Sequence, residues 1–153
     1  MFPDRLLGFS FTRGREPKRR IAPQALARFE ARVRELTCRT KGASLAQIIE
    51  ELSRYLIGWR GYFGFCETQS VLRARDEWIR RRLRAIAWKQ WRRGRTRFAE
   101  LRQRGVGRDL AAQTAGSPNG PWRLSNSPAL TIAMPNSFFA DLGLAPVAAQ
   151  PTA

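Results

Sequence analysis

An apolar stripe with helical spacing between residues 44 and 63 constrains the fold of this chain more than any other sequence feature. Its members recur at steps of three and four residues, and they are Leu45, Ile48, Ile49, Leu52, Leu56, Trp59 and Phe63. This spacing places apolar side chains on one face of an α-helix. Ser44 and Gln47 form a capping-box pattern at the start of the segment. The stripe therefore predicts a long amphipathic helix that buries this face against other elements.

Three glycines, Gly58, Gly61 and Gly64, fall roughly opposite that stripe. A glycine inside a helix costs about 1 kcal/mol relative to alanine, so three on one face require an explanation. Two interpretations stay open at this point. Either another backbone approaches this face closely, or the helix ends near Gly58 or Gly61.

Two further long helices are predicted on either side of this segment. The first extends from about Pro23 to Arg39, since proline suits the first helical turn. Its apolar face consists of Leu26, Phe29, Val33 and Leu36. The other follows Ser70 and extends to about Arg93, with a buried side of Leu72, Ile79, Leu83 and Ile86.

Two tryptophans, Trp88 and Trp91, lie away from the apolar side of the last helix, near arginines. One interpretation is that they stack on nucleic-acid bases from an outward face. The other is that they pack against the C-terminal segment, because large aromatic side chains are usually buried.

The segments that flank the three helices are shorter and less regular. Residues 1–21 predict a β-hairpin with Gly14 near its turn. Residues 22–95 form the predicted three-helix domain, and residues 96–145 a C-terminal appendage with short helices near 96–104, 107–115 and 136–143. The tail, residues 146–153, is predicted to be disordered. The fold class is therefore mainly α: an N-terminal β-hairpin, a three-helix bundle and a short irregular or helical appendage.

Positive charge is concentrated in the first two thirds of the chain. Overall, 28 Lys and Arg stand against 12 Asp and Glu, a formal net charge of +16. Residues 1–108 carry 27 of these basic and 10 of the acidic side chains. Such an excess favours a polyanionic partner, either nucleic acid or an anionic membrane surface. Arginine accounts for 25 of the basic residues, and its guanidinium binds phosphate bidentately and stacks on bases, which favours nucleic acid.

Residues that would support catalysis or metal binding are scattered. The chain has no histidine, and Cys38 and Cys66 form no close pair, so we expect no zinc site. The adjacent acids Glu50 and Glu51 point about 100° apart on a helix, so they cannot hold one ion together. No run of 18 apolar residues is present, so we expect no transmembrane helix. Since the arginine content favours nucleic acid, we also expect no membrane partner. These features indicate a binding protein with no cofactor and no catalytic machinery.

The segment Ile57-Gly58-Trp59-Arg60-Gly61-Tyr62-Phe63 resembles the Gly-Trp-x-x-Tyr-Phe signature of the group II intron maturase-specific domain. This domain, also called domain X, is the thumb of intron-encoded reverse transcriptases. Other segments agree in order. Leu6-Leu7-Gly8-Phe9-Ser10-Phe11 resembles the strand that closes the polymerase palm, Ile21-Ala22-Pro23 the entry to the first thumb helix, and residues 76–84 with 88–91 the third helix. Residues 120–125 and 136–144 resemble the segment after the thumb, so the likeness covers about residues 6–145.

The resemblance implies a helical thumb that binds intron RNA and, as a maturase, assists its folding and splicing. It also implies that the protein lies within a ribonucleoprotein of the bacterial cytoplasm. Gly58, Trp59, Tyr62 and Phe63 would be its structural signature. The finger and palm regions of the family's polymerases have no counterpart in this sequence, so we expect no polymerase activity, and residues 1–21 would be a remnant of the palm edge. One alternative is a thumb fragment of a split or truncated reverse transcriptase that needs a palm in trans. Another is a gene remnant without a role.

The candidate RNA-binding groups are basic residues of the three helices, together with one tryptophan. They are Arg28, Arg32, Arg39, Lys41, Arg54, Arg60, Arg80, Arg81, Arg84, Trp88, Lys89, Arg92 and Arg93. Arg28, Arg32 and Arg39 are expected to share one face of the first helix. We expect that face to form one groove with the outward side of the third helix.

Overall fold

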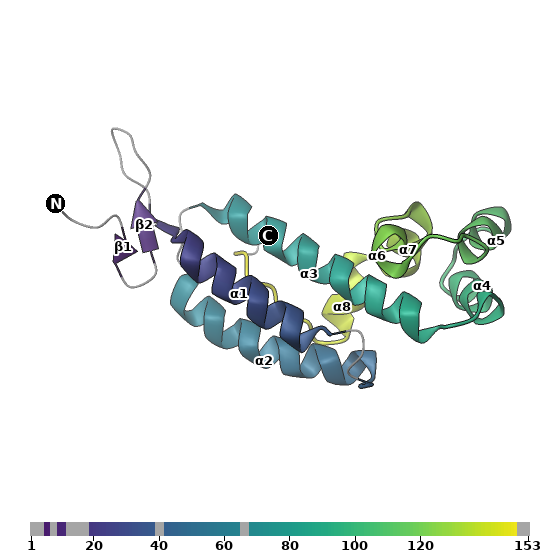
Figure 1. The fold of residues 1–153 in the computed structure, drawn as a ribbon, viewed down its shortest axis with the longest axis horizontal. Coiled ribbons are helices and arrows are strands. Elements are labelled where there is room, and N and C mark those ends of the chain that lie inside the picture. The colour runs from purple at the N-terminus through teal and green to yellow at the C-terminus, as the bar shows by residue number, and fades with distance from the viewer. Residues whose placement is uncertain (1–4, 7–8, 12–18, 39–41, 65–67, 150–153) are drawn as a thin grey trace.

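The computed structural model describes residues 5–6, 9–11, 19–38, 42–64 and 68–149. They form a mainly α-helical molecule in which three long helices lie side by side (Figure 1). These are α1 (Pro23–Leu36), α2 (Leu45–Phe63) and α3 (Gln69–Gln90). Five shorter helices follow: α4 (Gly94–Gln103), α5 (Arg108–Ala115), α6 (Pro121–Leu124), α7 (Pro128–Ala133) and α8 (Asn136–Asp141).

Three short segments near the N-terminus pair as antiparallel strands. They are β1 (Arg5–Leu6), β2 (Phe9–Phe11) and β3 (Arg19–Ile21), in the order β1-β2-β3. In the register, Phe9 lies opposite Ile21 and Phe11 opposite Arg19. Most of residues 1–18, including the segment around Gly14 that would turn the predicted hairpin, lies outside the described residues. The hairpin and its origin as a palm edge therefore stay predictions.

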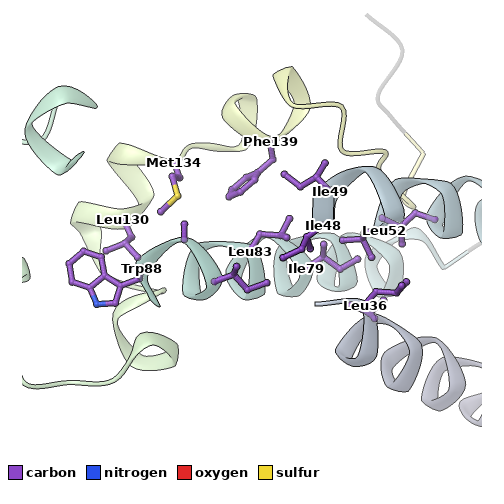
Figure 2. Close-up of a cluster of buried hydrophobic side chains, with 14 of the residues drawn as sticks. Leu36, Ile48, Ile49, Leu52, Ile79, Leu83, Trp88, Leu130, Met134 and Phe139 are labelled. Atoms are coloured by element: carbon purple, nitrogen blue, oxygen red, sulfur yellow. The ribbon is translucent and has the colours of Figure 1, made fainter. Parts of the chain in front are cut away.

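The predicted stripe on α2 forms the centre of the core. Figure 2 shows Ile48, Ile49 and Leu52 of α2 pointing toward Ile79 and Leu83 of α3, and all five are buried. The capping box at the start of α2 is present: the Ser44 hydroxyl accepts from the Gln47 N–H at 3.2 Å, and the Gln47 side chain accepts from the Ser44 N–H at 3.0 Å. The sequence pattern thus placed both the start and the buried face of α2 correctly.

Both interpretations of the α2 glycines are wrong. The helix continues through Gly58 and Gly61 to Phe63, so it does not end at either glycine. A Cβ added at Gly58 or Gly61 would meet no atom of the described residues within 4 Å, so no described backbone approaches there. The helix persists because burial of Leu56 and Trp59 on the opposite face outweighs the local cost of the glycines.

The first helix ends at Leu36, three residues earlier than predicted. Thr37 leaves the helix, and its buried hydroxyl donates to the Val33 carbonyl at 2.6 Å. The same hydroxyl accepts from Nε of Arg82 on α3 at 2.7 Å. The end of this helix therefore depends on a contact between residues 45 positions apart. The local sequence pattern does not predict it.

The C-terminal region shares one hydrophobic core with the three long helices, so the predicted boundary at residue 95 does not separate two cores. Helices α4 and α5 pair, α6 packs on α3, and α7 contacts both α4 and α5. Phe139 of α8 lies over Ile49 and Leu83 (Figure 2) and is fully buried.

The predicted disordered tail is wrong for residues 146–149. Val147 and Ala148 are buried, and their backbone N–H groups donate to the two carboxylate oxygens of Asp76 at 2.9 and 3.0 Å. The Ser53 hydroxyl donates to the Gly143 carbonyl at 2.9 Å, which ties the chain just before this segment to α2. Apolar burial and these side-chain acceptors order a stretch that looks like a loose tail in sequence.

Candidate nucleic-acid interface

Most of the arginines on α3 bind other parts of the protein. The Arg75 guanidinium forms an ion pair with Glu30 of α1 at 2.8 Å, and both side chains are about a quarter exposed. Arg82 donates to the hydroxyl and to the carbonyl of Thr37. These two arginines therefore fix α3 against α1 and the turn that follows it.

Arg81 and Arg84 hold the C-terminal region on α3. Arg81 donates to the Trp122 carbonyl at 3.0 Å, and its guanidinium carbon lies 3.9 Å from the centre of the Trp122 ring. Arg84 is 8% exposed and donates to the Met134 carbonyl at 2.9 Å. Burial lowers the pKa of the Arg84 guanidinium, and the like charge of Arg80 lowers it further. The predicted outward placement of Arg84 is wrong, because α7 and α8 dock on the face that carries it.

Trp88 is buried completely, so its predicted position on an outward RNA-binding face is also wrong. In Figure 2 its ring lies beside Leu130 of α7. The Arg97 guanidinium lies 4.6 Å from the centre of the same ring and donates to the Trp88 carbonyl. The alternative interpretation, packing against the C-terminal segment, is confirmed for Trp88.

Four basic side chains remain exposed where α3 gives way to α4, and we call them the basic tip: Lys89, Arg92, Arg93 and Arg95. The chain reverses here within a few residues, and Arg92 adopts a left-handed backbone with φ of 43°. Within the described ranges, none of the four side chains forms an ion pair. Three of them were predicted RNA-binding residues, and Arg95, on the first turn of α4, was not among the predicted ones.

An aromatic cleft lies between α1 and α3. The Trp78 ring is flanked by the guanidinium carbons of Arg34 and Arg82, each 5.4 Å from the ring centre. A cavity of about 240 Å³ adjoins it, lined by Arg34, Trp78 and the Arg75–Glu30 pair. The spacing of Arg75, Trp78 and Arg82 on one helical face was a signal in the sequence. The contribution of Arg34 from α1 could not be seen there.

The α1–α2 side carries four of the predicted residues on exposed positions: Arg28, Arg32, Arg54 and Arg60. Arg32 and Arg54 line one groove between the helices. Each is paired with a carboxylate, Arg32 with Glu35 at 2.9 Å and Arg54 with Glu50 at 3.1 Å, which reduces the positive charge of that groove. Arg39 and Lys41, also predicted, lie outside the described residues. Arg80, half-buried, lines a separate cavity beside α8.

The signature residues divide between core and surface. Trp59 is buried, with its ring centre 4.3 Å from that of Phe29 and 4.8 Å from that of Phe63. Tyr62 points outward with 48% of its surface exposed, edge-on to Phe63. Gly58 and Gly61 lie on the same open side of α2.

Neither metal chemistry nor a membrane span is indicated by the arrangement of side chains. In the residues that the structure covers, no three acidic or sulfur-bearing side chains gather where they could hold a metal ion. No helix in those ranges has the length and hydropathy required to cross a bilayer.

The chain was compared with models of known protein families. The family model of the group II intron, maturase-specific domain matches residues 26–105. The matched segment extends over 80 of the 153 residues and contains α2, α3 and α4 and most of α1. Among curated proteins, no sequence matches the chain.

Proposed function

Because the chain belongs to the group II intron maturase-specific domain family, which implies a maturase-related role in group II intron splicing, we propose that it binds intron RNA and assists RNA folding. The observation that carries the proposal is the basic tip, in which Lys89, Arg92, Arg93 and Arg95 are all exposed. Basic side chains without carboxylate partners gain most from contact with phosphate, because each contact releases counterions from the RNA.

The aromatic cleft supports the same proposal by a different interaction. Sequence-specific RNA binding proteins commonly stack unpaired bases on aromatic rings and guanidinium planes. Trp78 between Arg34 and Arg82 offers both kinds of surface within one cleft. Together, the tip would supply affinity and the cleft would favour unpaired regions of a folded RNA.

The proposed action is positioning rather than catalysis. The matching family is the maturase-specific domain and not the polymerase domain. A maturase of this kind lowers the free energy of the correctly folded intron by binding it more tightly than misfolded forms. We therefore propose that the chain stimulates splicing and extends no primer.

The test compares two triple variants that remove equal charge. Arg92→Gln, Arg93→Gln and Arg95→Gln remove the three arginines of the basic tip. Arg28→Gln, Arg32→Gln and Arg54→Gln remove three exposed arginines from the α1–α2 side. Affinity for a group II intron RNA is measured from 50 to 200 mM salt. The tip variant should lose more affinity, and its slope of log affinity against log salt should fall by about three contacts.

Circular dichroism serves as the folding control for both variants. Equal losses of affinity would mean that total charge governs binding, and the tip assignment would be wrong. Splicing is then measured with the chain alone. Stimulation that appears only after addition of a palm-containing fragment would favour the split reverse transcriptase instead.

A further inference from the structure

A cavity of about 390 Å³ lies between α3, α8 and the terminal segment 144–149. This volume falls in the range of sites that hold small ligands, roughly 300–1,000 Å³. The α3 wall carries charged side chains, and the terminal segment supplies an apolar floor that includes Leu144, Pro146 and Ala148. Neither the basic tip nor the aromatic cleft contains any of these residues.

The charged wall of the cavity differs from the rest of α3. Arg73, Glu77 and Arg80 follow one another at four and three residues, so they share one helical face. In the described part of the chain, no hydrogen bond or ion pair engages these three side chains. The other arginines of α3 are Arg75, Arg81, Arg82 and Arg84, and every one of them is bound to another element. The two arginines that face the cavity are thus the ones left available for an external anion.

Asp76 also lines the cavity, but its carboxylate is hydrogen-bonded within the protein. Both of its carboxylate oxygens accept backbone N–H groups, from Val147 and from Ala148. It therefore anchors the floor of the cavity and does not neutralise the arginines by a direct ion pair. Glu77 remains as the available acceptor on the α3 wall.

The opposite wall adds neutral polar groups. Asn136 and Ser137 of α8 line it. The Asn136 side-chain oxygen accepts from the Arg84 guanidinium at 3.4 Å, which orients the amide and leaves its N–H groups as donors. The cavity therefore combines cations, a carboxylate acceptor, amide donors and an apolar floor.

We propose that this cavity receives one unstacked nucleotide of the bound RNA. Its phosphate lies against Arg73 and Arg80, its base covers the apolar floor, and Glu77 accepts from a base N–H. A nucleotide matches all of these groups, because it joins an anion to a flat, weakly polar ring with N–H donors at its edge. A nucleotide that is already unpaired costs the least to extrude, so bulges are the expected source. The inference rests on the proposed function, since the RNA must first bind.

The experiment uses two RNA hairpins of matched sequence, one fully paired and one with a single bulged guanosine, and measures anisotropy with the full chain. The wild type should favour the bulged RNA about tenfold, the ratio for one charge-assisted hydrogen bond. Arg80→Gln should abolish this preference. The matched control is Arg108→Gln, an exposed arginine on α5. It should lower both affinities equally and keep the preference.

A second variant, Arg73→Gln at an exposed position, replaces Arg80→Gln if the latter changes the circular dichroism spectrum. Wild-type protein that binds both hairpins equally tightly would overturn the site and leave the proposed function standing. Preference retained in both cavity variants would overturn it as well. Failure to bind either RNA would overturn the proposed function and this site with it.

Discussion

Residues 80–84 and residues 92–95 carry similar densities of arginine, yet the structure uses the two groups differently. Arg81 and Arg84 are hydrogen-bonded to the C-terminal region, and Arg84 is buried. Arg92, Arg93 and Arg95 lie exposed at a chain reversal. The difference depends on what docks against each stretch, because α6, α7 and α8 cover the first and leave the second open. In an arginine-rich chain, the number of arginines does not by itself locate a nucleic-acid interface.

The largest effect on stability is expected at Trp88 of α3. A comparison with Trp78 of the same helix tests whether buried residues are structural and less buried ones bind RNA. Trp88→Ala should lower the free energy of unfolding by about 3–5 kcal/mol, because it empties a fully buried site. Trp78→Ala, at the half-buried position in the aromatic cleft, should cost less stability and more RNA affinity. Urea unfolding and RNA binding are measured for both. If Trp88→Ala keeps its free energy of unfolding in urea and loses RNA binding, the two roles are reversed.

A smaller effect is expected for the arginines themselves. Arg84→Ala should destabilise the protein by about 1–3 kcal/mol, since it leaves the Met134 carbonyl without its donor in a buried site. Arg93→Ala, at an exposed position, should change stability by less than about 0.5 kcal/mol. The slope of log RNA affinity against log salt should change more in Arg93→Ala than in Arg84→Ala. Comparable destabilisation by both substitutions would contradict the division between bound and exposed arginines.

The open face of α2 offers a substitution that should stabilise. Gly58→Ala should add about 1 kcal/mol, because a Cβ there meets no described atom within 4 Å and alanine favours the helix. The expected readout is a higher melting temperature with unchanged RNA affinity. Loss of RNA binding in this variant would show that RNA approaches the glycine face.

The smallest effect concerns the pH dependence of stability through Asp76. Burial raises the pKa of this carboxyl above its ordinary value of 3.8, against the opposing influence of its two backbone N–H donors and of Arg80 and Arg60. The folded state then holds the proton more tightly than the unfolded chain. This group's contribution to the free energy of unfolding should therefore fall as pH rises above 3.8. Asp76→Asn should remove that component, as measured by urea unfolding at a series of pH values. If the free energy of unfolding depends on pH in the same way in the wild type and in Asp76→Asn, the proposed contribution of Asp76 is wrong.

Local patterns predicted the parts of the fold that depend on neighbouring residues. The stripe from Leu45 to Phe63 and the Ser44–Gln47 cap identified α2 because helical periodicity and capping are properties of the segment itself. The end of α1 at Leu36 and the burial of Trp88 were missed, since Thr37 and Trp88 contact residues far along the chain. The order of residues 146–149 depends in the same way on Asp76, about 70 positions earlier.

The candidate site was predictable to a similar extent. Lys89, Arg92 and Arg93 follow the last apolar turn of α3, so their exposure could be expected from the sequence. The cleft around Trp78 needs Arg34 from another helix, and the cavity beside Arg80 needs the terminal segment as its floor. Both arise from the packing of distant elements, which composition and periodicity do not contain.

The attachment of the C-terminal region to α3 also has a consequence for biosynthesis. A ribosome releases α3 before residues 122–148, because chains are made from the N-terminus. During that interval Arg81 and Arg84 have not yet met Trp122 and Met134, and Asp76 has not met Val147. In the nascent chain, the two guanidinium groups and the Asp76 carboxylate therefore lack the hydrogen-bond partners that they have in the complete fold. Once residues 122–148 dock, Arg81 and Arg84 are engaged by backbone carbonyls, while the side chains of the basic tip stay exposed.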